Sequence, residues 1–173
     1  FAKKQLKMLL FGHIGMTAGI FYLVNLRLKR NIDYRFLVAG SLLSDIIDKP
    51  LGNIVLFNLL NNGRIIGHTL LFAVILAAIG LYRKRIVYLA GGVFAHLVLD
   101  RMWGDPQTLL WPLLGDFVRR DFRFTDIINS FYADPINYIG EMVGFAVVIF
   151  LIVRHRLYLK EKIKSFLKTG RLN

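Results

Sequence analysis

An imidazole and a carboxylate stand four residues apart in the apolar stretch from Val93 to Pro106. In a helix this spacing places His96 and Asp100 on one face, about one turn apart. A buried Asp without a partner would cost several kcal/mol, so a metal ion, Arg101 or another segment must balance it. The pair is therefore either part of a ligand or proton site, or a structural hydrogen bond that holds a helix end.

The composition is that of a membrane protein. The 173 residues are 55% hydrophobic with a mean hydropathy of +0.52, above the usage of an average soluble domain. We expect one integral membrane domain over residues 1–173, with a helix bundle in 1–153 and a basic tail in 154–173. The net charge of +12 comes mostly from the ends of apolar segments, which suits anionic lipid headgroups and argues against nucleic acid.

The apolar stretches predict an all-α, polytopic bundle of about five hydrophobic helices. These are expected at 8–26, 36–48, 64–82, 86–103 and 135–153. The broken apolar piece at 51–60 favours a re-entrant or interfacial segment, and 105–134 favours a loop or surface helix. Gly15 and Gly19 form a small-residue face for close helix contact. The tail predicts a basic amphipathic helix on an anionic leaflet.

Basic connections at 27–35, at 83–85 and in the tail predict that these ends face the cytoplasm. Measured from those basic ends at 1.5 Å per residue, seven ionisable side chains lie about 15 to 22 Å up their helices. They are His13, Asp45, Asp48, His68, His96, Asp100 and Glu141. We therefore expect one polar layer near the extracytoplasmic face of the inner or plasma membrane.

This layer could bind a metal. The chain has no Cys, so three imidazoles and several carboxylates would be the ligands, a set that suits zinc, with a manganese- or iron-type ion as an alternative. A metal-activated water would then attack an ester or phosphoester. We predict the metal ligands to be His13, Asp45, His68, His96 and Asp100.

Other polar residues are assigned roles around that set. Asp48 is a ligand or general base, and Arg64 and Arg101 either clamp a phosphate or form salt bridges with the acids. Glu141 is a weaker candidate, placed by height alone. Asp105 could face the substrate. Thr69 is either a ligand-orienting hydroxyl or a helix cap, and His155 is a surface residue of the tail.

The order of the motifs resembles a known family. His13 is followed by Leu42-Leu43-Ser44-Asp45-Ile46-Ile47-Asp48-Lys49-Pro50, by Arg64-x-x-x-His68-Thr69, and by His96-x-x-x-Asp100 with Leu110-Trp111-Pro112. Over residues 8 to 115 this resembles the YdjM-like, LexA-regulated inner-membrane proteins, described as metal-dependent hydrolases. The chain departs from the family pattern by Ser44 in place of Pro, by the spacing of Asp48, by Gly63 in place of a His, and by Thr69 in place of Ser.

The resulting hypothesis is a membrane-embedded, metal-dependent hydrolase whose substrate is an ester or phosphoester, with lipid-linked substrates favoured. The alternative is a non-catalytic structural subunit of an oligomer or larger membrane assembly, in which the polar layer holds helices together. A haem-binding subunit fits less well because acids crowd the histidines. An ion carrier usually has inverted repeats, and the sequence has none.

Overall fold

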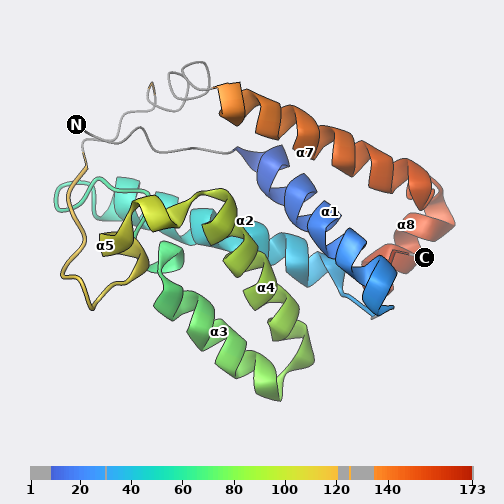
Figure 1. Cartoon of the computed structure of the whole chain (residues 1–173), viewed down its shortest axis with the longest axis horizontal. Helices are drawn as coiled ribbons and strands as arrows, with labels where there is room; N and C mark the ends of the chain where they lie inside the picture. Colours follow the sequence, from blue (N-terminus) through green and yellow to red (C-terminus); the bar gives the residue numbers. More distant parts are fainter. Residues whose placement is uncertain (1–8, 30, 121–124, 126–134, 173) are drawn as a thin grey trace.

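The computed structural model describes residues 9–29, 31–120, 125 and 135–172, and within them the chain is helical without a β-strand (Figure 1). The longer helices are α1 (Leu10–Leu28), α2 (Tyr34–Pro50), α3 (Leu70–Tyr82), α4 (Lys84–Leu99) and α7 (Pro135–Arg154). Shorter elements are α5 (Pro106–Leu109), α8 (Lys160–Thr169), a π-helical turn at Leu51–Val55, and 3₁₀ turns at Ile66–His68 and Met102–Gly104. The predicted all-α class is confirmed.

The prediction of a polytopic bundle of about five hydrophobic helices is confirmed only in part. Among the described residues, only α7 is long and apolar enough to cross a membrane by length and composition. Helix α3 is apolar but has 13 residues, or about 20 Å. Helices α2 and α4 have 17 and 16 residues. Helix α1 reaches 19 residues but includes the polar side chains of His13, Thr17 and Asn25, which lower its hydropathy.

Two predicted helix boundaries were wrong. The third helix was expected to begin at Arg64, yet His68 lies in a 3₁₀ turn and α3 begins after Thr69, whose side chain accepts a hydrogen bond from Phe72 N at 3.0 Å. The fourth helix was expected to reach Trp103, yet it ends at Leu99. Arg101 has a left-handed backbone with φ of 50°, which cannot continue a right-handed helix.

The two less regular stretches are described in part. Residues 51–60 form the π-helical turn followed by further turns. Within 105–134, α5 is followed by turns and irregular chain to residue 120, and Trp111 stacks on Phe117 with ring centroids 4.9 Å apart. Residues 121–124 and 126–134 of that predicted loop lie outside the described residues.

Helix α1 packs between α2 and α7, while α4 packs between α2 and α3 (Figure 1). Glycines make the closest contacts. A Cβ atom on Gly15 would lie 1.9 Å from the carbonyl oxygen of Gly144, and one on Gly92 would lie 2.1 Å from that of Leu37. The predicted small-residue face of α1 is therefore a contact surface for α7.

Helix α8 docks against the connection between α1 and α2. Tyr34 N donates to the carbonyl oxygen of Gly170 at 2.8 Å, and Arg35 Nη1 donates to those of Leu167 and Lys168 at 2.6 and 3.1 Å. A guanidinium at this position satisfies terminal carbonyls and complements the helix dipole. The predicted helix in the tail is confirmed, and its C-terminal end is fixed to the start of α2.

Candidate metal centre

Six predicted site residues converge at one end of the bundle. His13 comes from the beginning of α1, Asp45 and Asp48 from the last turns of α2, His68 from the 3₁₀ turn, and His96 and Asp100 from the end of α4. Five of them are at most 5% exposed, and Asp45 is partly exposed. Side chains at the same height on neighbouring helices do come together, as the polar layer requires.

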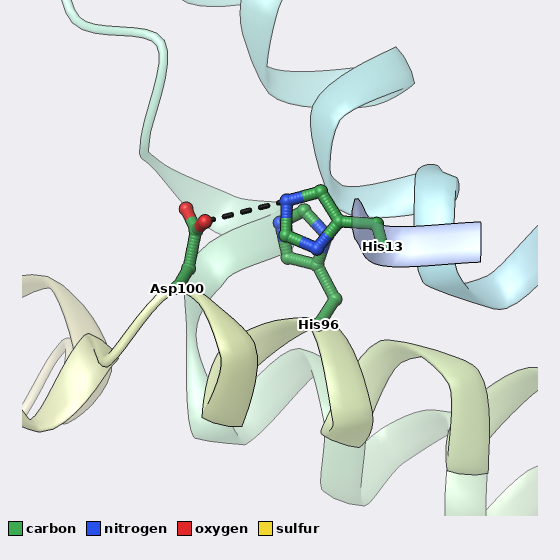
Figure 2. Close-up of side chains that lie close together, drawn as sticks. All are labelled: His13, His96 and Asp100. Carbon is green, nitrogen blue, oxygen red and sulfur yellow. Dashed lines mark ion pairs between the residues drawn. The ribbon is translucent and has the colours of Figure 1, made fainter. Parts of the chain in front are cut away.

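Two overlapping groups within this cluster bring enough candidate ligand atoms together to hold a metal ion. One consists of His13, His96 and Asp100, and the other of Asp45, His68 and His96. In each group the candidate ligand atoms lie within 4.8 Å of one another. Figure 2 shows the ring of His13 lying over that of His96, with Asp100 beside them. The two ring centroids are 4.1 Å apart and stacked.

Asp48 holds His68 in one orientation. Its carboxylate accepts backbone N–H groups from Ile65 at 2.7 Å, Gly67 at 2.8 Å and His68 at 3.1 Å. The same carboxylate lies 2.7 Å from His68 Nδ1. A carboxylate accepts hydrogen bonds, so Nδ1 carries the proton and the lone pair of the neutral ring sits on Nε2.

A different group fixes the same tautomer and ring orientation for His96. Its Nδ1 lies 2.8 Å from the carbonyl oxygen of Ser41, which can only accept, so the lone pair of His96 also sits on Nε2. The two Nε2 atoms of His68 and His96 are 3.1 Å apart. Two neutral rings would thus face each other with lone pairs, a repulsive arrangement that a shared cation or proton removes.

Asp100 is only half satisfied. Its Oδ2 accepts from Arg64 Nη2 at 2.5 Å, while Oδ1 lies 3.3 Å from His13 Nε2. Despite that distance, Asp100 Oδ1 and both ring nitrogens of His13 are buried without a hydrogen bond of acceptable geometry. Buried polar atoms are rarely left in this way, and a bound ion is one of the usual reasons.

Arg64 reaches Asp100 from an ordered loop. Its backbone N–H donates to Asn62 Oδ1 at 3.0 Å, and Asn62 Nδ2 donates to the carbonyl oxygen of Val118 at 3.0 Å. Arg64 is 9% exposed. The side chain of Arg101, by contrast, is exposed, and no described contact joins it to the cluster.

Other predicted candidates lie apart from the cluster. Glu141 accepts backbone N–H groups from Leu9, Phe11 and Gly12 at 2.7 to 3.0 Å, so it caps the start of α1 from α7. Asp105 pairs with Arg120.

The structure also shows the contacts of two further residues discussed from the sequence, Thr69 and His155. Thr69 caps α3, which is the second of its two predicted roles. His155 is half-buried, with its ring edge-on to Tyr22 at 5.4 Å, so the prediction of a plain surface residue is only partly met.

Sequence reasoning missed Ser41, whose carbonyl orients His96. Ser41, Ser44, Asp45 and Asp48 follow the i, i+3, i+4, i+7 spacing of one helix face, which was the available signal. Ser44 Oγ on that face is buried without a hydrogen-bond partner. The polar face of α2 therefore extends further than its two carboxylates.

Fold and site together define an all-helical protein with an apolar exterior and a buried histidine–carboxylate cluster where several helices end. The chain belongs to the YdjM inner membrane protein family, whose sequence profile matches residues 8–163. It is therefore an inner membrane protein. The match extends past residue 115, where the resemblance in the motifs ends, through α7 and into α8. Neither a curated protein nor a solved structure matches the chain significantly.

Proposed function

We propose that this protein is a membrane-embedded, metal-dependent hydrolase of an ester or phosphoester. The observation that carries the proposal is the pair of Nε2 atoms of His68 and His96, 3.1 Å apart, with each Nδ1 already committed to an acceptor. A ligand pair is oriented in this way, because each ring's second nitrogen is held by a carboxylate or carbonyl group.

The donor set fits zinc. The ligands would be Nε2 of His13, His68 and His96 together with oxygens of Asp45 and Asp100, all nitrogen and oxygen donors. Manganese is the alternative, since carboxylates contribute to the set. The atoms of His13 and Asp100 that lack a hydrogen bond are the donors that such an ion would satisfy. Asp48, the Ser41 carbonyl and Arg64 would orient the ligands.

A bound divalent ion would supply an activated water and an electrophile for a carbonyl or phosphoryl oxygen. The chain's own contribution would be to position the substrate and exclude bulk water. Arg64, whose Nη2 donates to Asp100, would bind a substrate oxyanion with its guanidinium group. Arg101 and Asp105 remain candidates for substrate contact, and Asp48 remains a candidate base.

Lipid-linked substrates and a cytoplasmic tail belong to the same proposal. Asp45 is the partly exposed member of the cluster, so it marks the side from which a substrate would enter. Basic residues at the ends of α1 and α7 and throughout α8 favour a cytoplasmic position for those ends. The five helices would then cross or enter the bilayer, with the metal centre near the extracytoplasmic face.

A structural subunit of a larger assembly is the second candidate. It is favoured by Asp48, whose carboxylate bonds three backbone N–H groups and an imidazole and so fixes the loop after α2 without any ligand. In that account the cluster joins α1, α2 and α4 and has no substrate.

Hydrolysis assays with the zinc- or manganese-loaded full chain in nanodiscs separate the two candidates. The substrates would be a nitrophenyl phosphate, a nitrophenyl ester and a lipid phosphate. We expect His96→Ala to lower the rate at least about a hundredfold, and His155→Ala, the matched control outside the cluster, to leave it unchanged. Equal rates for wild type and His96→Ala on every substrate would reject the hydrolase in favour of the structural role.

A further inference from the structure

A second candidate binding site lies at the opposite end of the bundle from the metal centre. A cavity of about 970 Å³ opens between the C-terminal end of α1, the connection into α2, the first turns of α4 and the C-terminal tail. His13 and Lys29 are 16 positions apart on α1, which corresponds to about 24 Å. The cavity and the metal centre are therefore separate sites.

The polar side of this cavity is strongly cationic. Lys29, Lys84, Arg85 and Arg171 line it, and Asp33 is the carboxylate among the described lining residues. Asp33 already forms an ion pair with Arg35, with 2.7 Å between Oδ2 and Nη2. The four cations thus face a cavity in which the one acid among the described lining residues is neutralised by Arg35, a residue outside the cavity. Such a site attracts a phosphate-type oxyanion.

The other side of the cavity is apolar. Phe21, Val24, Leu28 and Val87 line it, and three of them continue onto the exterior, where Val24, Leu28 and Val87 are 42%, 59% and 47% exposed. A free phosphate would gain nothing from these side chains. A phospholipid would place its headgroup among the cations and an acyl chain along α1 and α4.

We infer that this cavity binds the phosphate headgroup of an anionic membrane lipid, with an acyl chain lying against Phe21, Val24 and Val87. The lipid would connect α1 and α4 with the C-terminal tail, since Arg171 contributes one of the cations. Tail and bundle are already joined by the bond from Tyr34 N to Gly170 O and by Arg35. A bound headgroup therefore reinforces a contact that the fold makes by itself.

The site is tested on the full-length chain in neutral detergent, by counting retained lipids with mass spectrometry of the intact complex. Dioleoyl phosphatidylglycerol, dioleoyl phosphatidylcholine and inorganic phosphate are titrated separately. We expect phosphatidylglycerol to bind at least about tenfold more tightly than phosphatidylcholine. Inorganic phosphate is expected not to displace it at equal concentration. Equal binding of the two lipids, or displacement by inorganic phosphate, would overturn the inference.

Charge variants locate the binding. Lys84→Gln/Arg85→Gln is expected to weaken phosphatidylglycerol binding about tenfold, and Arg171→Gln about threefold. The control Lys160→Gln/Lys162→Gln removes the same charge from exposed positions of α8 and is expected to change binding less than about twofold. If the control loses as much as the α4 variant, binding is non-specific and the site is rejected. Arg171→Gln keeps the test decisive if the α4 variant does not fold, because Arg171 lies outside every helix.

Discussion

Asp48 and Asp100 are both buried carboxylates in contact with the same cluster, yet they differ in how their oxygens are satisfied. Asp48 accepts three backbone N–H groups and the Nδ1–H of His68. Asp100 has one oxygen on Arg64. The other lies 3.3 Å from His13 Nε2, and neither that oxygen nor the ring nitrogens of His13 form a hydrogen bond of acceptable geometry.

The difference separates a carboxylate whose hydrogen bonds are all supplied by the protein from one that lacks a hydrogen-bond partner or ligand on one oxygen. A satisfied buried carboxylate stabilises the fold and has little capacity left for a ligand. An unsatisfied one costs stability until a ligand arrives. We therefore expect mutations around Asp48 to act on the fold, and mutations around His13 to act on metal binding.

The largest effect is expected for Asp48→Ala. It leaves three buried N–H groups and the His68 imidazole without an acceptor, so the metal-free protein should lose about 3 to 5 kcal/mol of stability. Unfolding in mixed detergent micelles measures this. Asp116→Ala, at an exposed position, is the control. A loss below about 1 kcal/mol would remove the distinction between the two carboxylates.

Glu141→Gln extends the comparison to a carboxylate that caps a helix. Because Glu141 accepts the N–H groups of Leu9, Phe11 and Gly12, loss of its charge should cost about 1 kcal/mol. The same unfolding assay applies, with Glu161→Gln on exposed α8 as control. Metal affinity should be retained. A selective loss of metal with unchanged stability would instead make Glu141 a ligand.

His13→Gln sharpens the other side of the comparison. The ring nitrogens of His13 have no hydrogen bond to lose, so the free energy of unfolding of the metal-free protein should change by less than about 1 kcal/mol. Zinc affinity should fall at least about a hundredfold. Calorimetric zinc titration and metal-free unfolding are measured on the same preparation. Destabilisation as large as that of Asp48→Ala, with zinc affinity unchanged, would place His13 with the structural residues.

The smallest effect concerns Asp33, a carboxylate outside the helices that is fully paired. The hydrogen bond from the Arg35 side chain holds the pKa of Asp33 below its ordinary value of 3.8. Its contribution to stability is therefore present above that value and is lost as the pH falls through the lower folded pKa. When the pH is lowered below about 4, the melting temperature of the wild type should fall, and that of Asp33→Asn should fall less. Identical pH profiles would show that this pair adds nothing measurable.

The sequence predicted which ionisable side chains lie together better than it predicted the elements around them. His96 and Asp100 share a face at i, i+4 spacing. His13, Asp45 and His68 were grouped with them because they lie at similar heights along their own helices, measured from the basic ends. These relations depend on helix geometry alone. The family resemblance, which rested on the same motifs, was confirmed.

The features that the sequence did not reveal depend on contacts distant in the sequence. The turn at Ile66–His68 is held by Asp48, which accepts hydrogen bonds from its backbone N–H groups. Hydropathy does not reveal this contact, so the prediction began the third helix too early, at Arg64. Glu141 had the expected height, but it faces the start of α1, which no periodicity in α7 reveals. The five expected hydrophobic helices came from apolar length. Because of polar residues and early helix ends, α7 is the one helix among the described residues that is long and apolar enough to cross a membrane.

The metal content of the purified protein decides whether the cluster is a metal centre. The full chain is purified without chelators and measured by plasma mass spectrometry beside the double variant Asp45→Ala/His96→Ala, with melting checked for both. If the cluster is a metal centre, the wild type holds about one or more equivalents of zinc or manganese, and a variant that still folds loses them. No metal in either protein, even after incubation with excess zinc or manganese, would contradict the account and leave the cluster as a structural contact between helices.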